Sequence, residues 1–520
     1  MVSPQLALQY SDGHEQAVMG DEAMKEACGV FGVFAPGRDV ARLCFDGLYA
    51  LQHRGQESAG MAVSDQDTIT VVKDMGLVAS VFDDRTLSCL PGDLAVGHTR
   101  YSTAGPSTWH SAQPVYRPAG RAGFALAHNG NLTNTDVLAS KAGMLPGIVT
   151  NDSDIVAELM ASYYPPERPD CLDGTKPESL ENALVSTLAL LEGAFSFVLM
   201  DVDHVYGARD PNGFRPLCLG RLDPGEEDGS RGCGWILASE TAALDVVGAQ
   251  FVREIDPGEV VVIDADGVRS LHPFAPGQVN PKLCLFEFVY FARPDSWIYG
   301  REVHMARCRM GEYLATQSPA DADMVIGVPD SGISAAEGYA RRSGIAYGQG
   351  LVKNRYIGRT FIAPTQRDRD RGVRRKLNPL RESIKGKRLV VVDDSIVRGT
   401  TTKAMVRMLR DAGALEVHLR ISSPPFRWPC FYGIDTPNRD ELLAASRSVD
   451  DIALFLGADS VAYLDLQNLM LAIGAPAGNF CNACLTGNYP TDLPAAALEA
   501  ISSTPGGSDQ LDLAGAIRGG

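Results

Sequence analysis

The spacing of apolar residues changes once along the 520-residue chain, close to a proline-rich segment at 271–282. Before that segment, short apolar strands follow one another, and two helical stretches are expected at 154–164 and 178–191. After it, apolar strands such as 345–351 and 388–392 alternate with helices. The first pattern predicts an α+β domain, and the second predicts an α/β domain with a mostly parallel sheet. The chain is also too long for one ordinary core.

Charge and composition exclude several classes of function. The net charge of −17 argues against nucleic acid as the main partner, because binding to a phosphate backbone needs a broad basic surface. No apolar run free of charge reaches membrane-spanning length, and the acidic first 27 residues do not have the pattern of an export signal. We therefore expect a cytoplasmic protein that binds neither nucleic acid nor membranes. Its eleven cysteines should be mostly reduced thiols or metal ligands.

Cys28 stands at the start of the first predicted strand, in the sequence Glu-Ala-Cys-Gly-Val-Phe-Gly. A lone cysteine in such a place is more often a small buried thiol than a nucleophile. Three polar groups further along favour a nucleophile, because each follows a predicted strand, where side chains can converge on one cleft. These groups are His-Thr-Arg-Tyr-Ser-Thr at 98–103, His-Asn-Gly-Asn-Leu at 128–132 and Thr-Asn-Asp-Ser-Asp at 150–154.

These motifs, in this order, resemble the glutaminase domain of N-terminal-nucleophile amidotransferases, and the resemblance covers the first half of the chain. It implies a four-layer αββα fold and a glutamine substrate. Cys28 would attack the carboxamide, while Asn129 and Gly130 would stabilise the oxyanion. Arg100 would hold the carboxylate of glutamine, and Asp152 would hold its α-ammonium group.

Thiol chemistry is consistent with these roles. A thiol with a pKa near 8.5 needs a nearby base, and an α-amino group with a pKa of about 7.7–8.0 suits that task. Only a terminal cysteine carries such a group, so we expect cleavage of the Ala27–Cys28 bond and release of residues 1–27 as a propeptide. The alternative is a Cys28–His53 pair of the thiol-protease type, which needs no cleavage but leaves Asn129 and Gly130 without a role. His53 is more simply a packed or hydrogen-bonded histidine.

Two carboxylates follow the aliphatic strand Leu389–Val392, which is expected to be buried on both faces. Asp393 and Asp394 would then lie at the carboxyl end of a parallel strand, where open α/β sheets bind ligands. The residues after them offer small side chains, hydroxyls and N–H groups at a helix start, which suits a phosphate. The simpler interpretation makes Asp394 or Ser395 a helix cap.

This segment resembles the signature of type I phosphoribosyltransferases. The resemblance implies that Asp393 and Asp394 bind the ribose hydroxyls of phosphoribosyl pyrophosphate and help to place one Mg²⁺ per subunit. It also implies a pyrophosphate loop at 328–332, in which Ser331 is a further Mg²⁺ contact. The residues expected around the 5-phosphate are Ser395, Gly399, Thr400 and Thr401.

The stretch from Lys353 to Arg388 carries thirteen Lys or Arg residues against three acidic residues. Such a patch is either a solvated loop or a site for a small polyanion. Its run through 366–378 resembles the flap that folds over phosphoribosyl pyrophosphate in these amidotransferases. Closure of a flap would exclude water from a reactive sugar centre. Lys353 and Arg355 are the ligands that this resemblance suggests.

Four cysteines occur in contexts that resemble the cluster-bearing branch of the amidophosphoribosyltransferase family. They are Cys284, Cys430, Cys481 and Cys484. The resemblance implies that they hold one 4Fe-4S cluster per subunit, away from both chemical sites. Zinc is the alternative, because a set of four thiolates serves either metal.

Together the motifs cover nearly the entire chain and resemble the amidophosphoribosyltransferase family. The resemblance implies conversion of glutamine, phosphoribosyl pyrophosphate and water to 5-phosphoribosylamine, glutamate and pyrophosphate, the first committed step of purine synthesis. Ammonia would pass between the two sites through an internal channel. The resemblance also implies a homotetramer that purine nucleotides inhibit.

Two other classes compete with this interpretation. A ligand-sensing regulator could retain the phosphoribosyltransferase fold without catalysis, but it would have no need for the Cys28 motif set. An amidotransferase that shares only the first domain would not need the Asp393 loop. The expected division of the chain is a propeptide at 1–27, a glutaminase domain at 28–264, a linker at 265–282, a phosphoribosyltransferase domain at 283–490 and a flexible tail at 491–520.

Overall fold

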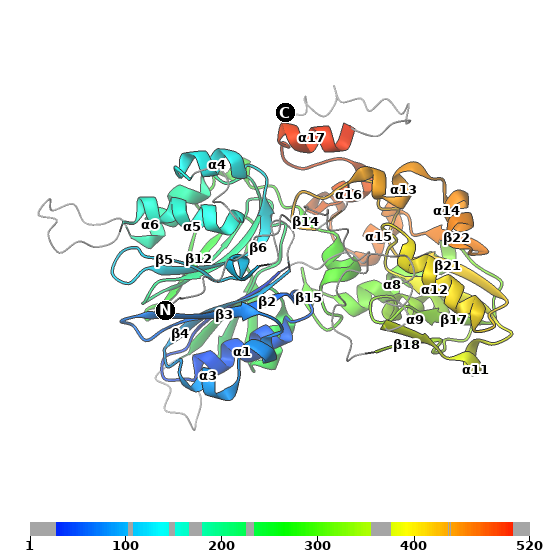
Figure 1. The fold of residues 1–520 in the computed structure, drawn as a ribbon, viewed down its shortest axis with the longest axis horizontal. Helices are drawn as coiled ribbons and strands as arrows, with labels where there is room; N and C mark the ends of the chain where they lie inside the picture. Colours follow the sequence, from blue (N-terminus) through cyan, green and yellow to red (C-terminus); the bar gives the residue numbers. More distant parts are fainter. Residues whose placement is uncertain are drawn as a thin grey trace, which may run out of the picture.

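The structure is a computed structural model that describes residues 28–101, 108–144, 151–165, 179–224, 233–354, 376–434, 436 and 438–502. The predicted propeptide, Arg355 and most of the predicted flap lie outside these residues. The described chain forms two halves that lie side by side, the first blue to green and the second green to red (Figure 1). Within the described residues, no helix is both long and apolar enough to cross a membrane.

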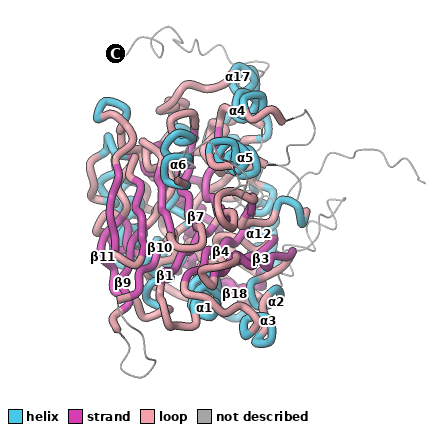
Figure 2. The backbone as a smooth tube through the Cα atoms, turned by 90° about the vertical axis from the view of Figure 1, so that its left-hand side faces the viewer, coloured by secondary structure: helices cyan, strands magenta, loops and turns pink. Residues whose placement is uncertain are grey.

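Two antiparallel sheets form the centre of the first half. Their strands are β1 (Gly29–Phe34), β2 (Ser58–Ser64), β3 (Ile69–Met75), β4 (Leu94–Arg100), β5 (Val115–Arg117), β6 (Phe124–Leu132), β7 (Gly193–Met200), β8 (Val205–Arg209), β9 (Cys218–Leu222), β10 (Gly234–Ala238), β11 (Gln250–Glu254), β12 (Val260–Asp264) and β13 (Gly267–Leu271). The seven-stranded sheet has the order β11-β9-β10-β1-β4-β2-β3, part of which is seen across the molecule in Figure 2. The six-stranded sheet has the order β13-β12-β8-β7-β6-β5.

The two sheets pack face to face through apolar side chains such as Val30, Val198 and Leu237. Gly32 allows this close approach, because a Cβ there would lie 2.5 Å from a methyl carbon of Val198. Helices cover the outer face of each sheet (Figure 1). Those on the seven-stranded sheet are α1 (Val40–Ala50), α2 (Val78–Val81), α3 (Asp84–Ser88) and α7 (Thr241–Val246), and those on the other are α4 (Thr135–Lys141), α5 (Asp152–Tyr163) and α6 (Leu180–Leu188). The predicted αββα layering is therefore confirmed.

The second half is built on a parallel sheet in the order β17-β20-β21-β22. Its strands are β17 (Met324–Gly327), β20 (Arg388–Asp393), β21 (Glu416–Ile421) and β22 (Ser460–Tyr463). Its longer helices are α8 (Val303–Gln317), α9 (Ile333–Ser343), α12 (Thr400–Asp411), α14 (Val449–Leu456) and α15 (Leu466–Ile473). Val390 contributes to the core on one face of β20 and Leu389 to the core on the other, so the strand is buried on both faces as predicted.

Shorter elements connect and extend these two cores. The strands are β14 (Leu283–Cys284), β15 (Trp297–Ile298), β16 (Arg301–Glu302), β18 (Leu351–Lys353), β19 (Leu377–Pro379) and β23 (Phe480–Cys481). The helices are α11 (Arg381–Ile384), α13 (Leu443–Ser446), α16 (Ala483–Thr486), α17 (Ala495–Ser502), the π-turn η3 (Glu287–Phe291) and the 3-10 turns η1 (Trp109–Ser111), η2 (Pro276–Gln278), η4 (Arg439–Glu441) and η5 (Ala477–Asn479).

Three segments differ from the sequence-based expectation. The strand expected at 345–351 forms only an isolated bridge between Val325 and Tyr347 and, at Leu351, the start of β18, since Gly348 and Gly350 weaken a strand there. The six-stranded sheet of the first half continues past residue 264, because β13, which lies inside the predicted linker, pairs with β12. Helix α17 lies within the predicted tail, and its Ile501 carbonyl accepts a hydrogen bond from Arg439.

Candidate active sites and cysteine cluster

Cys28 lies in a small pocket of the first half. Its lining residues are Cys28, Arg100, Tyr101, Gln113, His128, Gly130, Asn151 and Asp152. The pairing of β1 with β4 brings Cys28 and Arg100 together, because Gly29 stands opposite Thr99. The thiol donates to the Tyr101 carbonyl at 3.4 Å and accepts from the Tyr101 N–H at 3.5 Å. Burial raises the pKa of the Cys28 thiol, so this sulfur needs a base to become a nucleophile at neutral pH.

Asn129 and Gly130 lie within strand β6 rather than in a turn. Gly130 has φ +154°, and a Cβ there would lie 2.1 Å from the Ala194 carbonyl oxygen, so a side chain cannot be accommodated. The Asn129 side chain is buried, yet within the described chain neither atom of its amide has a hydrogen-bond partner. Burial of an amide without hydrogen bonds costs free energy, and a ligand that bonds to the amide would recover part of that cost.

Asp152 is the first residue of α5 and faces the same pocket. Burial alone would raise the pKa of its carboxyl, but His128 and the Leu132 N–H lower that pKa on balance. The N–H of Leu132 donates to the carboxylate at 3.2 Å. An ionised carboxylate at this position suits a cationic ligand group. Arg100 is almost completely buried, with its Nη1 3.7 Å from a carboxylate oxygen of Glu57.

One pocket residue, Gln113, lies outside the motifs that the sequence analysis singled out. The Gln113 side chain accepts a hydrogen bond from the His128 backbone N–H at 2.7 Å and donates to the Ser153 hydroxyl at 3.0 Å. It therefore links β6 to the start of α5. Nothing in the sequence around Gln113 indicates this role, because both partners are distant along the chain.

His53 is hydrogen-bonded rather than paired with Cys28. Its Nε2 lies 2.7 Å from Glu240 Oε1, and its Nδ1 lies 3.2 Å from the Ala50 carbonyl oxygen. The simpler interpretation of this histidine is confirmed. Both of its ring nitrogens are occupied by contacts that stabilise the fold.

The carboxylate pair lies at the carboxyl end of β20, in the second half. Asp394 is buried, and its carboxylate accepts hydrogen bonds from the hydroxyls of Ser331 and Ser395. Burial and the neighbouring Asp394 raise the pKa of Asp393 well above its usual range, and burial also raises that of Asp394. A divalent cation would relieve this crowding of negative charge. The structure thus brings together three residues that we predicted as Mg²⁺ contacts.

The residues after the pair form the start of α12. Gly399 is the N-terminal flanking residue with φ +80°, and a Cβ there would lie 2.6 Å from a Leu443 methyl carbon. Thr400 and Thr401 are the first two residues of the helix and are partly exposed. Lys353 Nζ contacts Asp330, in the predicted pyrophosphate loop, at 2.7 Å. This arrangement suits a phosphate at the helix start.

The four predicted cluster cysteines come from distant parts of the chain and meet in one buried region. Cys284 pairs directly with Cys481 in a two-stranded parallel sheet, β14 with β23. The Cys484 carbonyl accepts hydrogen bonds from the N–H groups of Arg427 and Trp428, which lead into Cys430. Burial raises the pKa of the Cys484 thiol well above its usual range, and the neighbouring thiols of Cys430, Cys284 and Cys481 contribute to the same shift. A positively charged metal centre would stabilise the thiolate form of four cysteines in this arrangement.

A cluster of fully buried charges joins the two halves. Glu287 of the second half accepts from Arg54 Nη2 at 2.5 Å and lies 3.2 Å from Arg215 Nη1. Arg54 also pairs with Glu240, which in turn accepts from the Arg293 N–H at 2.9 Å. All of these side chains except Arg293 are fully or almost fully buried. The buried ion pairs fix how the first half sits on the second.

The Cys430 loop, residues 428–434, contacts strand β6 of the Cys28 pocket. Asn131 Nδ2 donates to the Phe431 carbonyl at 3.0 Å, and Arg215 Nη2 donates to the Tyr432 carbonyl at 2.9 Å. A Cβ on Gly433 would lie 3.2 Å from the carbonyl carbon of Gly130. The loop that carries one cluster cysteine therefore packs against the strand that carries Asn129 and Gly130.

Comparisons with known proteins agree with this division. A family model described as a glutamine amidotransferase domain matches residues 98–245, and one described as a phosphoribosyl transferase domain matches residues 310–422. A Mycobacterium bovis amidophosphoribosyltransferase is 52% identical over 501 residues, covering 93% of this chain and 91% of the relative. A Synechococcus elongatus amidophosphoribosyltransferase is 49% identical, covering 90% and 92%.

Solved structures show the same likeness over both halves. Glutamine phosphoribosylpyrophosphate amidotransferase from B. subtilis, complexed with ADP and GMP, is 42% identical with a TM-score of 0.79, covering 90% of this chain and 99% of that one. A structure described as the allosteric regulatory enzyme of purine biosynthesis is also 42% identical, with a TM-score of 0.80 and coverage of 90% and 97%.

The fold and the two sites define an enzyme in which a glutamine amidotransferase domain is joined to a phosphoribosyltransferase domain. The similarity to curated relatives over nine-tenths of the chain identifies it more closely. The chain belongs to the amidophosphoribosyltransferase family. The resemblance inferred from the motifs is thereby confirmed.

The buried ion pairs predict a large effect of Arg54→Met on stability. The change leaves Glu240 and Glu287 buried without one of their cationic partners, so we expect a loss of about 3–5 kcal/mol in the free energy of unfolding. Urea unfolding of the variant and the unaltered protein measures this loss. The control is Arg42→Met, which breaks the exposed pair with Asp84 and should change stability little. A similarly small loss for both variants would contradict the role of Arg54.

Proposed function

We propose that this chain transfers the amide nitrogen of glutamine to phosphoribosyl pyrophosphate, giving 5-phosphoribosylamine, glutamate and pyrophosphate in purine synthesis. The observation that carries the proposal is the convergence of Cys28, Arg100 and Asp152 on one pocket, in a chain that also holds a carboxylate pair at a parallel-sheet edge. The same two activities are joined in relatives named amidophosphoribosyltransferase. Neither a regulator nor a simple glutaminase accounts for both sites.

The glutaminase step begins with maturation. Cleavage of the Ala27–Cys28 bond creates an α-amine, which accepts the thiol proton that burial would otherwise retain. The sulfur attacks the carboxamide carbon, and the Asn129 amide and the Gly130 N–H stabilise the oxyanion. The amine then protonates the departing nitrogen, so ammonia leaves and a thioester remains. Water hydrolyses the thioester to glutamate and restores the thiol.

Arg100 and Asp152 orient glutamine during this step. The guanidinium of Arg100 binds the α-carboxylate, because its planar donors match a carboxylate in two places. The ionised Asp152 binds the α-ammonium group. Opposite charges around the α-carbon of the substrate select an amino acid over a simple amide.

The second step occurs at the edge of the parallel sheet. Ser395, Gly399, Thr400 and Thr401 bind the 5-phosphate, while Asp393 and Asp394 bind the ribose hydroxyls. Mg²⁺, when bound by Asp393, Asp394 and Ser331, neutralises charge on the pyrophosphate. Ammonia reaches C1 of the sugar through an internal channel, forms the new C–N bond and gives up a proton as pyrophosphate leaves. Lys353, and Arg355 outside the described residues, are the further contacts that we propose for the substrate.

We assign the four cysteines to a 4Fe-4S cluster rather than to zinc. Tetrahedral zinc with Zn–S bonds of about 2.3 Å places its sulfurs about 3.8 Å apart. Among the described residues, only one group of three His, Cys, Asp or Glu side chains has its ligand atoms within 4.8 Å of one another, and it consists of His304, Cys308 and Glu337. The sulfur atoms of any three of the four cysteines are therefore farther apart than that. Wider spacing suits a cluster in which each thiolate binds a different iron.

The remaining elements of the proposal concern assembly and regulation. A homotetramer in the cytoplasm, inhibited by purine nucleotides, follows from the family resemblance. The B. subtilis relative was crystallised with ADP and GMP, which supports purine nucleotides as ligands of this chain. The domain boundaries that we propose are those of the motifs, except that the six-stranded sheet of the first domain extends to Leu271.

Asn129→Ala should selectively impair the use of glutamine. Loss of one oxyanion donor typically lowers kcat by about 10²–10³-fold. Product formation with ammonium salt as the nitrogen source should stay near that of the unaltered protein, because ammonia bypasses the Cys28 pocket. The exposed Asn182→Ala serves as control. Equal losses with both nitrogen sources would refute the assignment.

Asp394→Asn should impair amination of the sugar and leave glutamine hydrolysis intact. We expect formation of the aminated ribose phosphate to fall by at least about 100-fold with either nitrogen source, because the sugar-phosphate site loses a charge. Hydrolysis of glutamine without phosphoribosyl pyrophosphate should continue at its basal rate. Pyrophosphate release and glutamate release, measured side by side, separate the two activities. Asp440→Asn, at an exposed position, is the control.

The cluster assignment is tested by chemical analysis of anaerobically purified protein. We expect about four iron and four sulfide per chain and no stoichiometric zinc. Cys481→Ser should lower the iron content and the midpoint of thermal unfolding, whereas the exposed Cys89→Ser should change neither. One zinc per chain without sulfide would overturn the assignment.

A further inference from the structure

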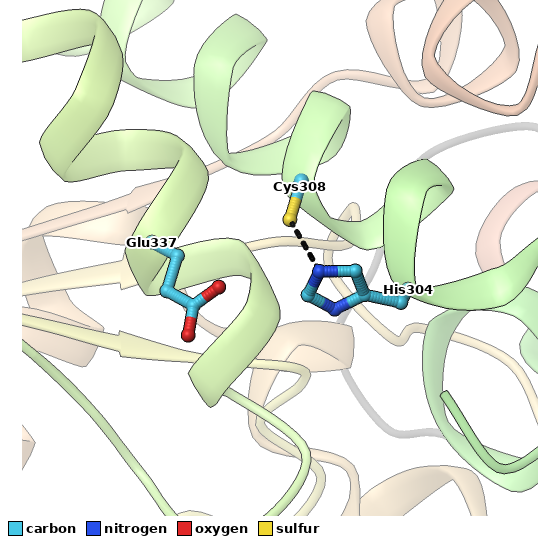
Figure 3. A group of neighbouring side chains, drawn as sticks. All are labelled: His304, Cys308 and Glu337. Carbon is cyan, nitrogen blue, oxygen red and sulfur yellow. Dashed lines mark hydrogen bonds between the residues drawn. The ribbon is translucent and has the colours of Figure 1, made fainter. Parts of the chain in front are cut away.

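A second group of metal-ligand side chains lies where α8 packs on α9. His304 and Cys308 are four residues apart on α8 and so share one face of the helix. Glu337 comes from α9. One ligand atom from each of the three side chains lies within 4.8 Å of the other two. The close-up in Figure 3 shows the three side chains near one another. The cysteine is buried, whereas the histidine and the glutamate are partly exposed.

The backbone holds the two helices unusually close at this point. A Cβ on Gly338 would lie 1.8 Å from the Cys308 carbonyl oxygen, and a Cβ on Gly311 would lie 1.8 Å from the Ala335 carbonyl oxygen. Both glycines therefore permit direct contact between the helix backbones. Because Gly338 follows Glu337, this contact fixes the glutamate relative to Cys308. The three ligands are positioned by rigid elements rather than by loops.

A hydrogen bond orients the imidazole. His304 Nδ1 lies 2.9 Å from the Ser334 hydroxyl, which leaves Nε2 directed toward Cys308 Sγ at 3.6 Å. Metal-binding histidines commonly use their second ring nitrogen in this way, which fixes the tautomer and the ring orientation. The serine thus prepares Nε2 as a ligand.

Neighbouring side chains do not compete with a metal ion for the Glu337 carboxylate or the Cys308 thiol. Within the described chain the Glu337 carboxylate makes no hydrogen bond or ion pair, and the nearby Arg341 is paired with Glu312 at 3.2 Å. Burial raises the pKa of the Cys308 thiol to about 11, so the thiol keeps its proton until a cation replaces it. Binding would form a metal–sulfur bond and release that proton to water.

We propose that His304, Cys308 and Glu337 bind one Zn²⁺-class divalent cation, with water as the fourth ligand. A thiolate and an imidazole select such an ion over Mg²⁺, which prefers oxygen ligands. The site is therefore distinct from the Asp393 and Asp394 pair. It would also link α8 to the first turns of α9, which begins two residues after Ser331. Partial exposure of the histidine and the glutamate gives the ion a route from solvent.

The test uses the anaerobic holoenzyme and Co²⁺ as a spectroscopic probe. We expect one equivalent of Co²⁺ to produce a thiolate-to-cobalt charge-transfer band and tetrahedral visible bands. Zn²⁺ should abolish these bands and raise the midpoint of thermal unfolding, since it binds the folded state. Iron content, measured before and after titration, verifies that the four-cysteine site has not exchanged its metal.

Variants assign the ion to these residues. Cys308→Ser should remove the charge-transfer band, and His304→Ala or Glu337→Gln should weaken binding by about 100-fold or more. Ser334→Ala keeps all three ligands and should weaken binding by about tenfold. Cys89→Ser, at an exposed thiol, is the matched control and should bind as the unaltered protein does.

The proposal fails if the holoenzyme shows no charge-transfer band at equimolar Co²⁺. It also fails if the band persists in Cys308→Ser and His304→Ala. Should Cys308→Ser not fold, the milder Ser334→Ala and Glu337→Gln still decide, because unchanged affinity in both would overturn the assignment.

Discussion

The carboxylate of Glu287 lies between the guanidinium groups of Arg54 and Arg215, and all three side chains are fully buried. Because the glutamate belongs to the second half and both arginines to the first, the attraction acts across the junction of the domains. Burial of these charges is costly unless each keeps its partners. The orientation of the two halves is therefore tightly specified, and the other contacts between the halves depend on it.

The same junction ties the cysteine cluster to the glutaminase pocket. Arg215 bonds both to Glu287 and to the Tyr432 carbonyl, and the loop of Tyr432 packs on the strand of Gly130. Phe214 and Tyr432 stack with their ring centroids 4.3 Å apart, which adds apolar contact at the same point. Cys430, one of the cysteines that we assign to a metal cluster, belongs to this loop, and the Cys484 carbonyl accepts hydrogen bonds from Arg427 and Trp428 at its start. A short series of packed groups therefore joins Cys430 to the strand of Asn129 and Gly130.

Much of the architecture was predictable, because local pattern and strand order determine it. The buried run Leu389–Val392 predicted a central parallel strand, and the structure places Asp393 and Asp394 at its carboxyl end. The family, the αββα and α/β folds and the class of enzyme are confirmed by the comparisons. The roles of the individual site residues remain predictions, although the structure brings Cys28, Arg100 and Asp152 into one pocket.

What the sequence could not indicate depends on partners far apart in the chain. Arg54 and Glu287 are separated by 233 positions, so neither shows its partner in any local pattern. Glu337 joins His304 and Cys308 only because Gly311 and Gly338 let two helices touch.

The hydrogen bond from Asn131 to the Phe431 carbonyl has a consequence for recombination between relatives. The two domains have separate cores, and each matches its own family model, so exchange of one half looks simple. Yet a hybrid that takes its glutaminase from one parent and its phosphoribosyltransferase from another needs the carboxylate of Glu287 opposite Arg54 and Arg215. It also needs a loop that holds the Phe431 carbonyl within reach of Asn131. Natural variation at these positions should be correlated, and the two halves should be inherited as a single unit.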